Sequence, residues 1–195
     1  MERRGRRVLA MDCVLAAAET HRGRPLNEIV SHHMRDAAEL AGFFSAHAVW
    51  SLSDGETLVP IYGYAQPESG RAMERLDLPR LEQSVEFGKA RLAENPHKAK
   101  AAVLIYDGRI TLEGRKVDSL IVEFRTFAEE GAAVLAIPYT PKKMFKRFAV
   151  HRPKLLEISP KHEGEMSGIL EAFFKGVEDH KKGAAVWDKH LDESM

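Results

Sequence analysis

Apolar residues along much of the chain recur every three or four positions, which is the spacing of one face of an α-helix. In the segment 25–41, charged residues fill the positions between the apolar ones, as a half-buried helix requires. Gly42 follows directly and is a reasonable helix stop. The same spacing predicts four more helices, over residues 8–20, 78–94, 160–177 and 184–191.

Between the second and third of these helices the pattern changes to that of strands. Asp54-Gly55 separates two apolar segments, 46–52 and 57–62, and Asp-Gly is a strong hairpin signal because both residues tolerate positive φ. Pro60 has no amide proton to donate, so the second strand should be an edge strand or end there. Residues 65–76 are polar and are predicted to form a connecting loop.

From residue 101 to residue 139, short apolar segments follow one another without a long connection. The turns between them are predicted at Asp107-Gly108, at Gly114 and at Gly131. Parallel strands need crossovers of a dozen or more residues, so this spacing predicts an antiparallel meander. The strands themselves are expected over residues 101–106, 109–113, 118–124 and 132–139, with one more over 155–158.

These elements predict a two-layer α+β fold. We expect an antiparallel sheet, a meander plus a hairpin with about five to seven strands, and helices mainly on one face. The 195 residues suit a single domain, 1–195. Within it, residues 1–7 should form a flexible basic arm and residues 183–195 a C-terminal tail or short helix.

The composition of the chain indicates its compartment and makes some classes of partner unlikely. The chain has one cysteine, Cys13, and 29 basic against 29 acidic residues. A single cysteine rules out an internal disulfide and favours a reducing compartment. Zero net charge makes nucleic acid an unlikely main partner, because phosphate neutralisation supplies most of that affinity. Asp12 interrupts the apolar run that follows the N-terminal arginines, and no apolar stretch is long enough to span a bilayer. We therefore expect a soluble cytoplasmic protein with no membrane partner.

The most suggestive candidate site is a basic, aromatic run at 142–154, which contains no acidic residue. If Thr140-Pro141 began a helix through Phe148, its free amides would add to the positive charge and attract anions. The competing interpretation is a solvated face whose charges balance the acidic helix after Pro160. The candidate residues are Lys142, Lys143, Lys146, Arg147, His151 and Arg152.

Motifs for the best-marked enzyme classes are absent: the chain has no G-x-S-x-G, P-loop or dinucleotide-binding G-x-G-x-x-G sequence. His32 and His33 are adjacent, so on a helix their rings point about 100° apart and cannot share one metal ion. Cys13 lies among alanines and apolar residues, which is typical of a buried thiol. We expect neither a cofactor nor a metal.

Two classes of function stay open from the sequence. One is a non-catalytic binding or interaction domain that uses the basic run for an acidic protein or a small anionic ligand. The other is an enzyme with an unmarked site near residues 139–152, in which His151 is the acid–base group. A deep pocket joining His151 to a carboxylate and a polar aromatic residue would favour the enzyme, and a flat or convex surface there would favour the interaction domain. The apolar strands and Trp187, which could dock on the body or on another chain, also predict a homodimer.

Overall fold

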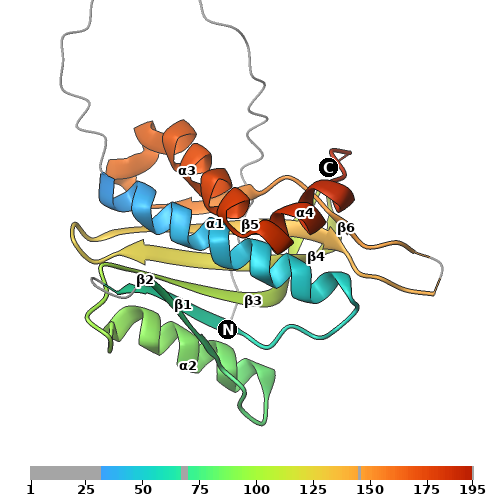
Figure 1. The fold of residues 1–195 in the computed structure, drawn as a ribbon, viewed down its shortest axis with the longest axis horizontal. Helices are drawn as coiled ribbons and strands as arrows, with labels where there is room; N and C mark the ends of the chain where they lie inside the picture. The colour runs from blue at the N-terminus through green and yellow to red at the C-terminus, as the bar shows by residue number, and fades with distance from the viewer. Residues whose placement is uncertain (1–31, 67–69, 145, 195) are drawn as a thin grey trace, which may run out of the picture.

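The structure is a computed structural model, and it describes residues 32–66, 70–144 and 146–194 (Figure 1). The predicted arm at 1–7, the helix predicted over 8–20 and Cys13 lie outside these residues. The helices are α1 (His32–Ser53), α2 (Leu81–Glu94), η1 (Pro160–Glu165), α3 (Met166–Asp179) and α4 (Lys181–His190). The strands are β1 (Ile61–Gln66), β2 (Gly70–Arg75), β3 (Ala101–Leu112), β4 (Arg115–Thr126), β5 (Gly131–Thr140), β6 (Ala149–Val150) and β7 (Lys154–Ile158).

The seven strands form one antiparallel sheet in the order β2-β1-β3-β4-β5-β6, with β7 also paired to β5. α1 lies across β1, β3 and β4 on one face, and α3 and α4 pack against α1 on that side (Figure 1). α2 packs on the opposite face, against β1 and β3. The prediction of an α+β fold with a meander sheet and helices mainly on one face is confirmed.

The hairpin predicted across Asp54-Gly55 is wrong. The alanine-rich segment 46–52 continues α1, which is 22 residues long, and Gly55 ends it with a φ of 89°. Its amide donates to the carbonyl of Leu52 at 2.9 Å, so the Asp-Gly pair acts as a helix stop. The actual hairpin is β1–β2, and β2 with the end of β1 lies within the residues 65–76 that were predicted to be a loop. β2 has mostly exposed or half-exposed side chains because it is the edge strand, which explains its polar sequence.

The turn predicted at Asp107-Gly108 is also wrong. β3 runs straight through both residues to Leu112, and the chain turns at Glu113 and Gly114, which have φ values of 48° and 77°. Asp107 stays in the strand because its carboxylate accepts a hydrogen bond from the Tyr139 hydroxyl at 2.9 Å. Tertiary contact therefore overrides the local turn preference of Asp-Gly at this position.

Two apolar cores lie on the two faces of the sheet. The larger one is formed by α1, α3 and α4 with the inward residues of β3, β4 and β5, and it contains Trp187 at 2% exposure. Trp187 packs edge-on against Phe173 and Phe174, so the C-terminal helix docks on the body of its own chain. The smaller core lies between α2 and the sheet: Leu92 comes from α2, and Tyr62 and Leu104 lie on the strand face opposite the larger core. Among the described residues, no helix combines the length and the apolar character that a bilayer span requires.

α1 and α3 approach so closely that only glycine fits at the contact. A Cβ on Gly42 would lie 1.8 Å from the carbonyl oxygen of Phe173, and one on Gly176 would lie 1.9 Å from that of Glu39. Both obstacles are backbone atoms, which cannot move aside without shifting a whole helix. This contact fixes how α3 lies on α1.

We expect Gly42→Ala to destabilise the protein by about 1–3 kcal/mol, because the added methyl group forces the two helices apart. The measurement is the midpoint of urea unfolding. Gly164→Ala is the matched control, since nothing lies within 4 Å of a Cβ at that position. Equal stability of the two variants would show that the helix contact adapts and is not a fixed constraint.

Candidate functional site

The basic run predicted from the sequence forms a projecting hairpin, not a helix. Tyr139 and Thr140 pair with β6, and Lys143 pairs with Lys146 through two backbone hydrogen bonds of 3.0 and 3.1 Å. The helix predicted from Thr140-Pro141 to Phe148 is wrong, so no helix N-terminus lies here to bind anions. We call residues 140–144 and 146–149 the basic hairpin; Figure 1 shows it extending beyond the end of the sheet.

Four of the six candidate residues lie on this hairpin: Lys142, Lys143, Lys146 and Arg147. All four are exposed, and no carboxylate among the described residues is within ion-pair distance of them. Met144, near the tip, has 90% of its surface exposed. The predicted balance with the acidic C-terminal helices is therefore not made by direct ion pairs, and the hairpin presents uncompensated positive charge beside an apolar side chain.

The base of the hairpin is anchored on the body. Phe148 is buried, and its ring lies 6.2 Å from that of Tyr139 and 5.5 Å from that of His190. His190 Nδ1 lies 3.1 Å from the carbonyl oxygen of Phe148. A carbonyl only accepts, so Nδ1 carries the hydrogen and donates it. α4 thus holds the strand that leaves the hairpin.

The other two candidates do not join the cations on the hairpin. His151 is 1% exposed, and its Nδ1 donates to the carbonyl of Asp192 at 2.8 Å. Its Nε2 is buried without a partner. Arg152 is exposed and forms a 2.7 Å ion pair with Glu193. The C-terminal tail therefore covers His151 and neutralises Arg152.

A carboxylate and a polar aromatic do lie near the base of the hairpin, but they bind each other. The Tyr139 hydroxyl donates to Asp107 at 2.9 Å, and burial raises the pKa of both groups. The negative charge of Asp118 raises the pKa of Asp107 further, while the hydrogen bond from Tyr139 and the positive charge of Arg109 lower it. The pair fastens β5 to β3 at the point where the hairpin begins.

The structure also contains a polar cluster that the sequence did not suggest. His97 Nε2 lies 2.6 Å from Glu74 Oε1, and Arg91 donates to the same carboxylate at 2.8 Å. The His97 ring stacks on Tyr64 with 4.0 Å between centroids. These residues come from β1, β2, α2 and the loop after it, so no spacing along the chain could have indicated them. Because the carboxylate is already shared by Arg91 and His97, we interpret the cluster as a clamp between α2 and the β1–β2 hairpin.

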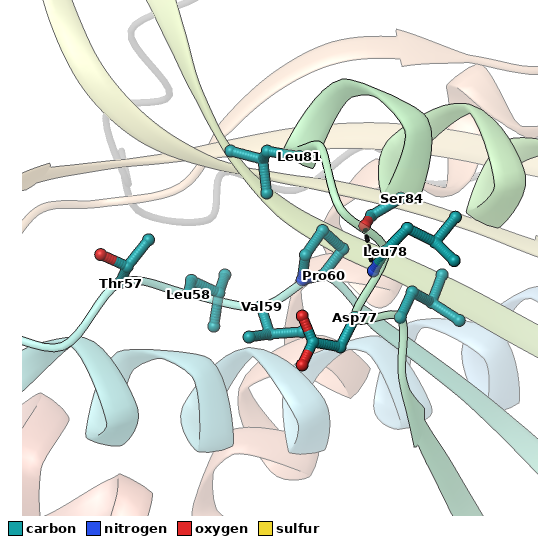
Figure 2. A pocket seen from close by; sticks show the side chains of 9 residues that line it. Thr57, Leu58, Val59, Pro60, Asp77, Leu78, Leu81 and Ser84 are labelled. Atoms are coloured by element: carbon teal, nitrogen blue, oxygen red, sulfur yellow. Dashed lines mark hydrogen bonds between the residues drawn. The ribbon is translucent and has the colours of Figure 1, made fainter.

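Two shallow hollows lie elsewhere on the surface. One, of about 200 Å³, separates the segment 57–60 from the start of α2 and is mostly apolar (Figure 2). Ser84 Oγ on its far wall accepts a hydrogen bond from the Leu78 amide at 3.1 Å. The other, of about 270 Å³, lies between the start of α1 and the sheet and is lined by His33, Asp36 and Lys100 among others. Neither is lined by any residue from 139 to 152.

No group of three or more histidine, cysteine, aspartate or glutamate side chains in the described part of the chain is placed to hold a metal ion. Comparison with known proteins adds no further assignment: no family model, curated protein or solved structure matches this chain significantly. The interpretation of the site therefore depends on its geometry.

We expect Asp107→Asn to stabilise the protein at neutral pH. Because the pKa of Asp107 is raised in the folded state, folded protein binds this proton more readily than unfolded protein does. The charged carboxylate therefore lowers the free energy of unfolding as pH rises through the folded-state pKa. Below the unfolded value of about 3.8 the carboxyl is neutral in both states and has no such effect. Asparagine keeps an oxygen for the Tyr139 hydroxyl without the charge. The gain should stay below about 1 kcal/mol, since solvent screens this half-exposed group.

The measurement is the melting temperature of wild type and variant across the acidic and neutral range. The gain should shrink as pH falls, because the wild-type carboxyl also becomes neutral. Asp107→Ala is the control: it removes the acceptor and should lower stability at every pH. An asparagine variant that is less stable at neutral pH would contradict the unfavourable charge.

Proposed function

We propose that this protein is a non-catalytic interaction domain that binds an acidic protein segment through the basic hairpin. The observation that carries the proposal is the hairpin itself, which projects from the sheet (Figure 1) with Lys142, Lys143, Lys146 and Arg147 exposed and with no acidic partner among the described residues. Ion pairs formed there on binding replace none within the part of the chain that the structure describes. The pairs gained with a partner are therefore a net gain, reduced only by desolvation and salt screening.

The shape of the hairpin favours a protein partner over a small anion. A small anion is bound most strongly in a concave site where several donors converge, and neither described hollow includes this segment. The cations are spread along a two-stranded ribbon, which suits an extended chain with several carboxylates. Met144 supports the same interpretation, because an exposed, flexible thioether is a common apolar contact in adaptable protein interfaces.

The buried state of His151 argues against the enzyme alternative. A general acid or base must come within hydrogen-bond reach of its substrate. Nδ1 of His151 is committed to Asp192, and the ring is 1% exposed. Tyr139 and Asp107 are committed to each other. Catalysis at 139–152 would first require the C-terminal tail to leave.

The experiment compares binding of wild type and of K142E/K143E/K146E to an immobilised poly-glutamate peptide. Exposed ion pairs are each worth about 0.2–1 kcal/mol, so the loss of three of them should weaken binding at least about threefold. Wild-type affinity should also fall between about 50 mM and about 200 mM salt, because these charges are exposed. K98E/K116E/K161E is the control, with the same charge change at exposed lysines elsewhere.

The control separates a local effect from a change of net charge. Loss in the hairpin variant alone supports the proposal. Equal loss in both variants, or no wild-type binding to the peptide at either salt concentration, overturns it. Protection by inorganic phosphate in a thermal shift assay, without peptide binding, would also overturn it and assign the hairpin to small anions.

Self-association is a separate proposal, and the sheet supports it. α2 makes its sheet contacts with β1 and β3. On the rest of that face an apolar group including Ile110, Ile121 and Ala136 is bordered by half-buried Val134 and Leu156. Trp187, which also suggested a dimer, is buried within the chain and gives no support.

If the protein is a dimer, light scattering of the wild type should give twice the chain mass of 21.9 kDa. Val134→Lys should reduce the measured mass to that of one chain. A monomeric wild type would contradict the dimer.

A further inference from the structure

Two histidines that are far apart in the sequence meet where α1, α3 and α4 converge. His47 lies on α1, and His180 lies at the junction of α3 and α4. His47 Nδ1 and His180 Nε2 are 3.2 Å apart. The other nitrogen of the His180 ring, Nδ1, accepts the backbone amide of Gly183 at 2.9 Å, so this ring caps the N-terminus of α4. The two contacts form one chain of hydrogen bonds from α4 to α1.

The direction of each hydrogen bond in this chain is fixed by chemistry. A backbone amide only donates, so Nδ1 of His180 has no hydrogen. In a neutral ring the hydrogen is then on Nε2, and it is donated to His47 Nδ1. His47 in turn carries its own hydrogen on Nε2. Both rings are therefore neutral and share one tautomer, and each nitrogen at the contact has a defined role.

Adding a proton breaks this chain at whichever ring receives it. On His47 the proton goes to Nδ1, and two N–H groups would then face each other across 3.2 Å. On His180 the proton goes to Nδ1, and the Gly183 amide loses its acceptor. Gly183 lies directly against α1, since a Cβ there would be 2.4 Å from the carbonyl oxygen of Ala46, so the lost hydrogen bond is at the contact between the two helices. Either protonation weakens the docking of α4.

The charged groups around the pair do not favour protonation. From β2, Arg75 acts on His47 and Arg71 lies over the Phe43 ring that packs against His180. From α4, Lys182 lies over Trp50, whose ring packs against both histidines. The acids nearby are already paired: Arg71 binds Asp179 of α3 and Glu39 of α1 at 2.9 Å each, and Lys175 of α3 binds Glu39. No described carboxylate pairs with either imidazole.

The C-terminal end of α4 is attached by bonds that a proton leaves intact. His190 Nδ1 and His151 Nδ1 both donate to carbonyl oxygens, of Phe148 and Asp192. A doubly protonated imidazole still donates from Nδ1. The Asp192 amide donates to the carbonyl of Val150 at 2.9 Å. Of these hydrogen bonds, the ones that an added proton breaks are therefore at the N-terminal end of α4.

We propose that α4 is a pH-released strap, docked on α1 while His47 and His180 are both neutral and freed at its N-terminal end when either one takes up a proton. Release uncovers the apolar surface around Trp187, which is 2% exposed in the docked state. The strap does not depend on the basic hairpin having a partner.

The direction of the pH effect follows from His47. Burial lowers the pKa of His47, and repulsion from Arg75, and from His180 whenever that ring is protonated, lowers it further. The undocked ring, with a pKa of about 6.5, therefore binds protons more readily than the docked ring. The docking contribution is fully present above about pH 6.5 and is lost as pH falls through the lowered value.

Hydrogen exchange of the wild-type protein tests the strap. Protection factors of α4 amides, corrected for intrinsic rates, should fall between about pH 7.5 and about pH 5.5, by up to about tenfold per pH unit for one proton. Those of β3 and β4 should stay constant over the same range. NMR spectra of the imidazole ring nitrogens near neutral pH should show the hydrogen on Nε2 of both histidines. A hydrogen on Nδ1 of either ring would overturn the proposed chain.

Variants then separate the pair from other titrating groups. Asparagine offers an oxygen close to the position of Nδ1, so H47N/H180N keeps both acceptors but has nothing to titrate. We expect its α4 protection to be independent of pH. H190N, the matched control on the same helix, should keep the wild-type pH dependence. If H47N/H180N does not fold, the two single variants replace it, and each should weaken the dependence. A pH dependence unchanged by these substitutions overturns the proposal.

Discussion

The contact between the backbones of α1 and α3 at Gly42 and Gly176 determines where everything on the helical side of the sheet lies. Helices usually pack with their axes 8–10 Å apart and with side chains between them. Here a Cβ at either glycine would overlap a carbonyl of the other helix. Because α3 is held this close, its C-terminal end brings His180 onto His47, and α4 starts in contact with α1 at Gly183. A looser contact would separate the two imidazoles and leave α4 without its N-terminal attachment.

The strands and helices that the sequence predicted well are those whose side chains meet the core in a regular way. In β3, β4 and β5 the alternate residues enter the large core, so their pattern is visible from the sequence. Two of the errors have a common cause. Asp-Gly occurs at 54–55 and at 107–108, and it is a local signal that several structures satisfy. At Gly55 it ends a helix, and at Asp107 a hydrogen bond to Tyr139 keeps it in a strand.

The candidate site shows the same division between local and distant information. Its positive charge was predictable, because Lys142, Lys143, Lys146 and Arg147 are neighbours and exposed lysines need no special packing. The burial of His151 was not predictable, because it depends on Asp192, which is 41 residues further along the chain. The His47–His180 contact spans 133 positions, and neither residue has a neighbour that marks it. Chemistry that depends on two distant side chains needs the fold before it can be recognised.

A chain of zero net charge can still present an electrostatic site, because net charge is a sum and a binding partner senses only the local field. At physiological ionic strength, charges are screened beyond about 8 Å, so acidic residues elsewhere on the surface do little to cancel a projecting patch. The hairpin moves its cations away from the body, where Arg71, Arg91 and Arg152 are all paired with acids. These three arginines have acidic partners, whereas no acid in the described residues pairs with the cations of the hairpin.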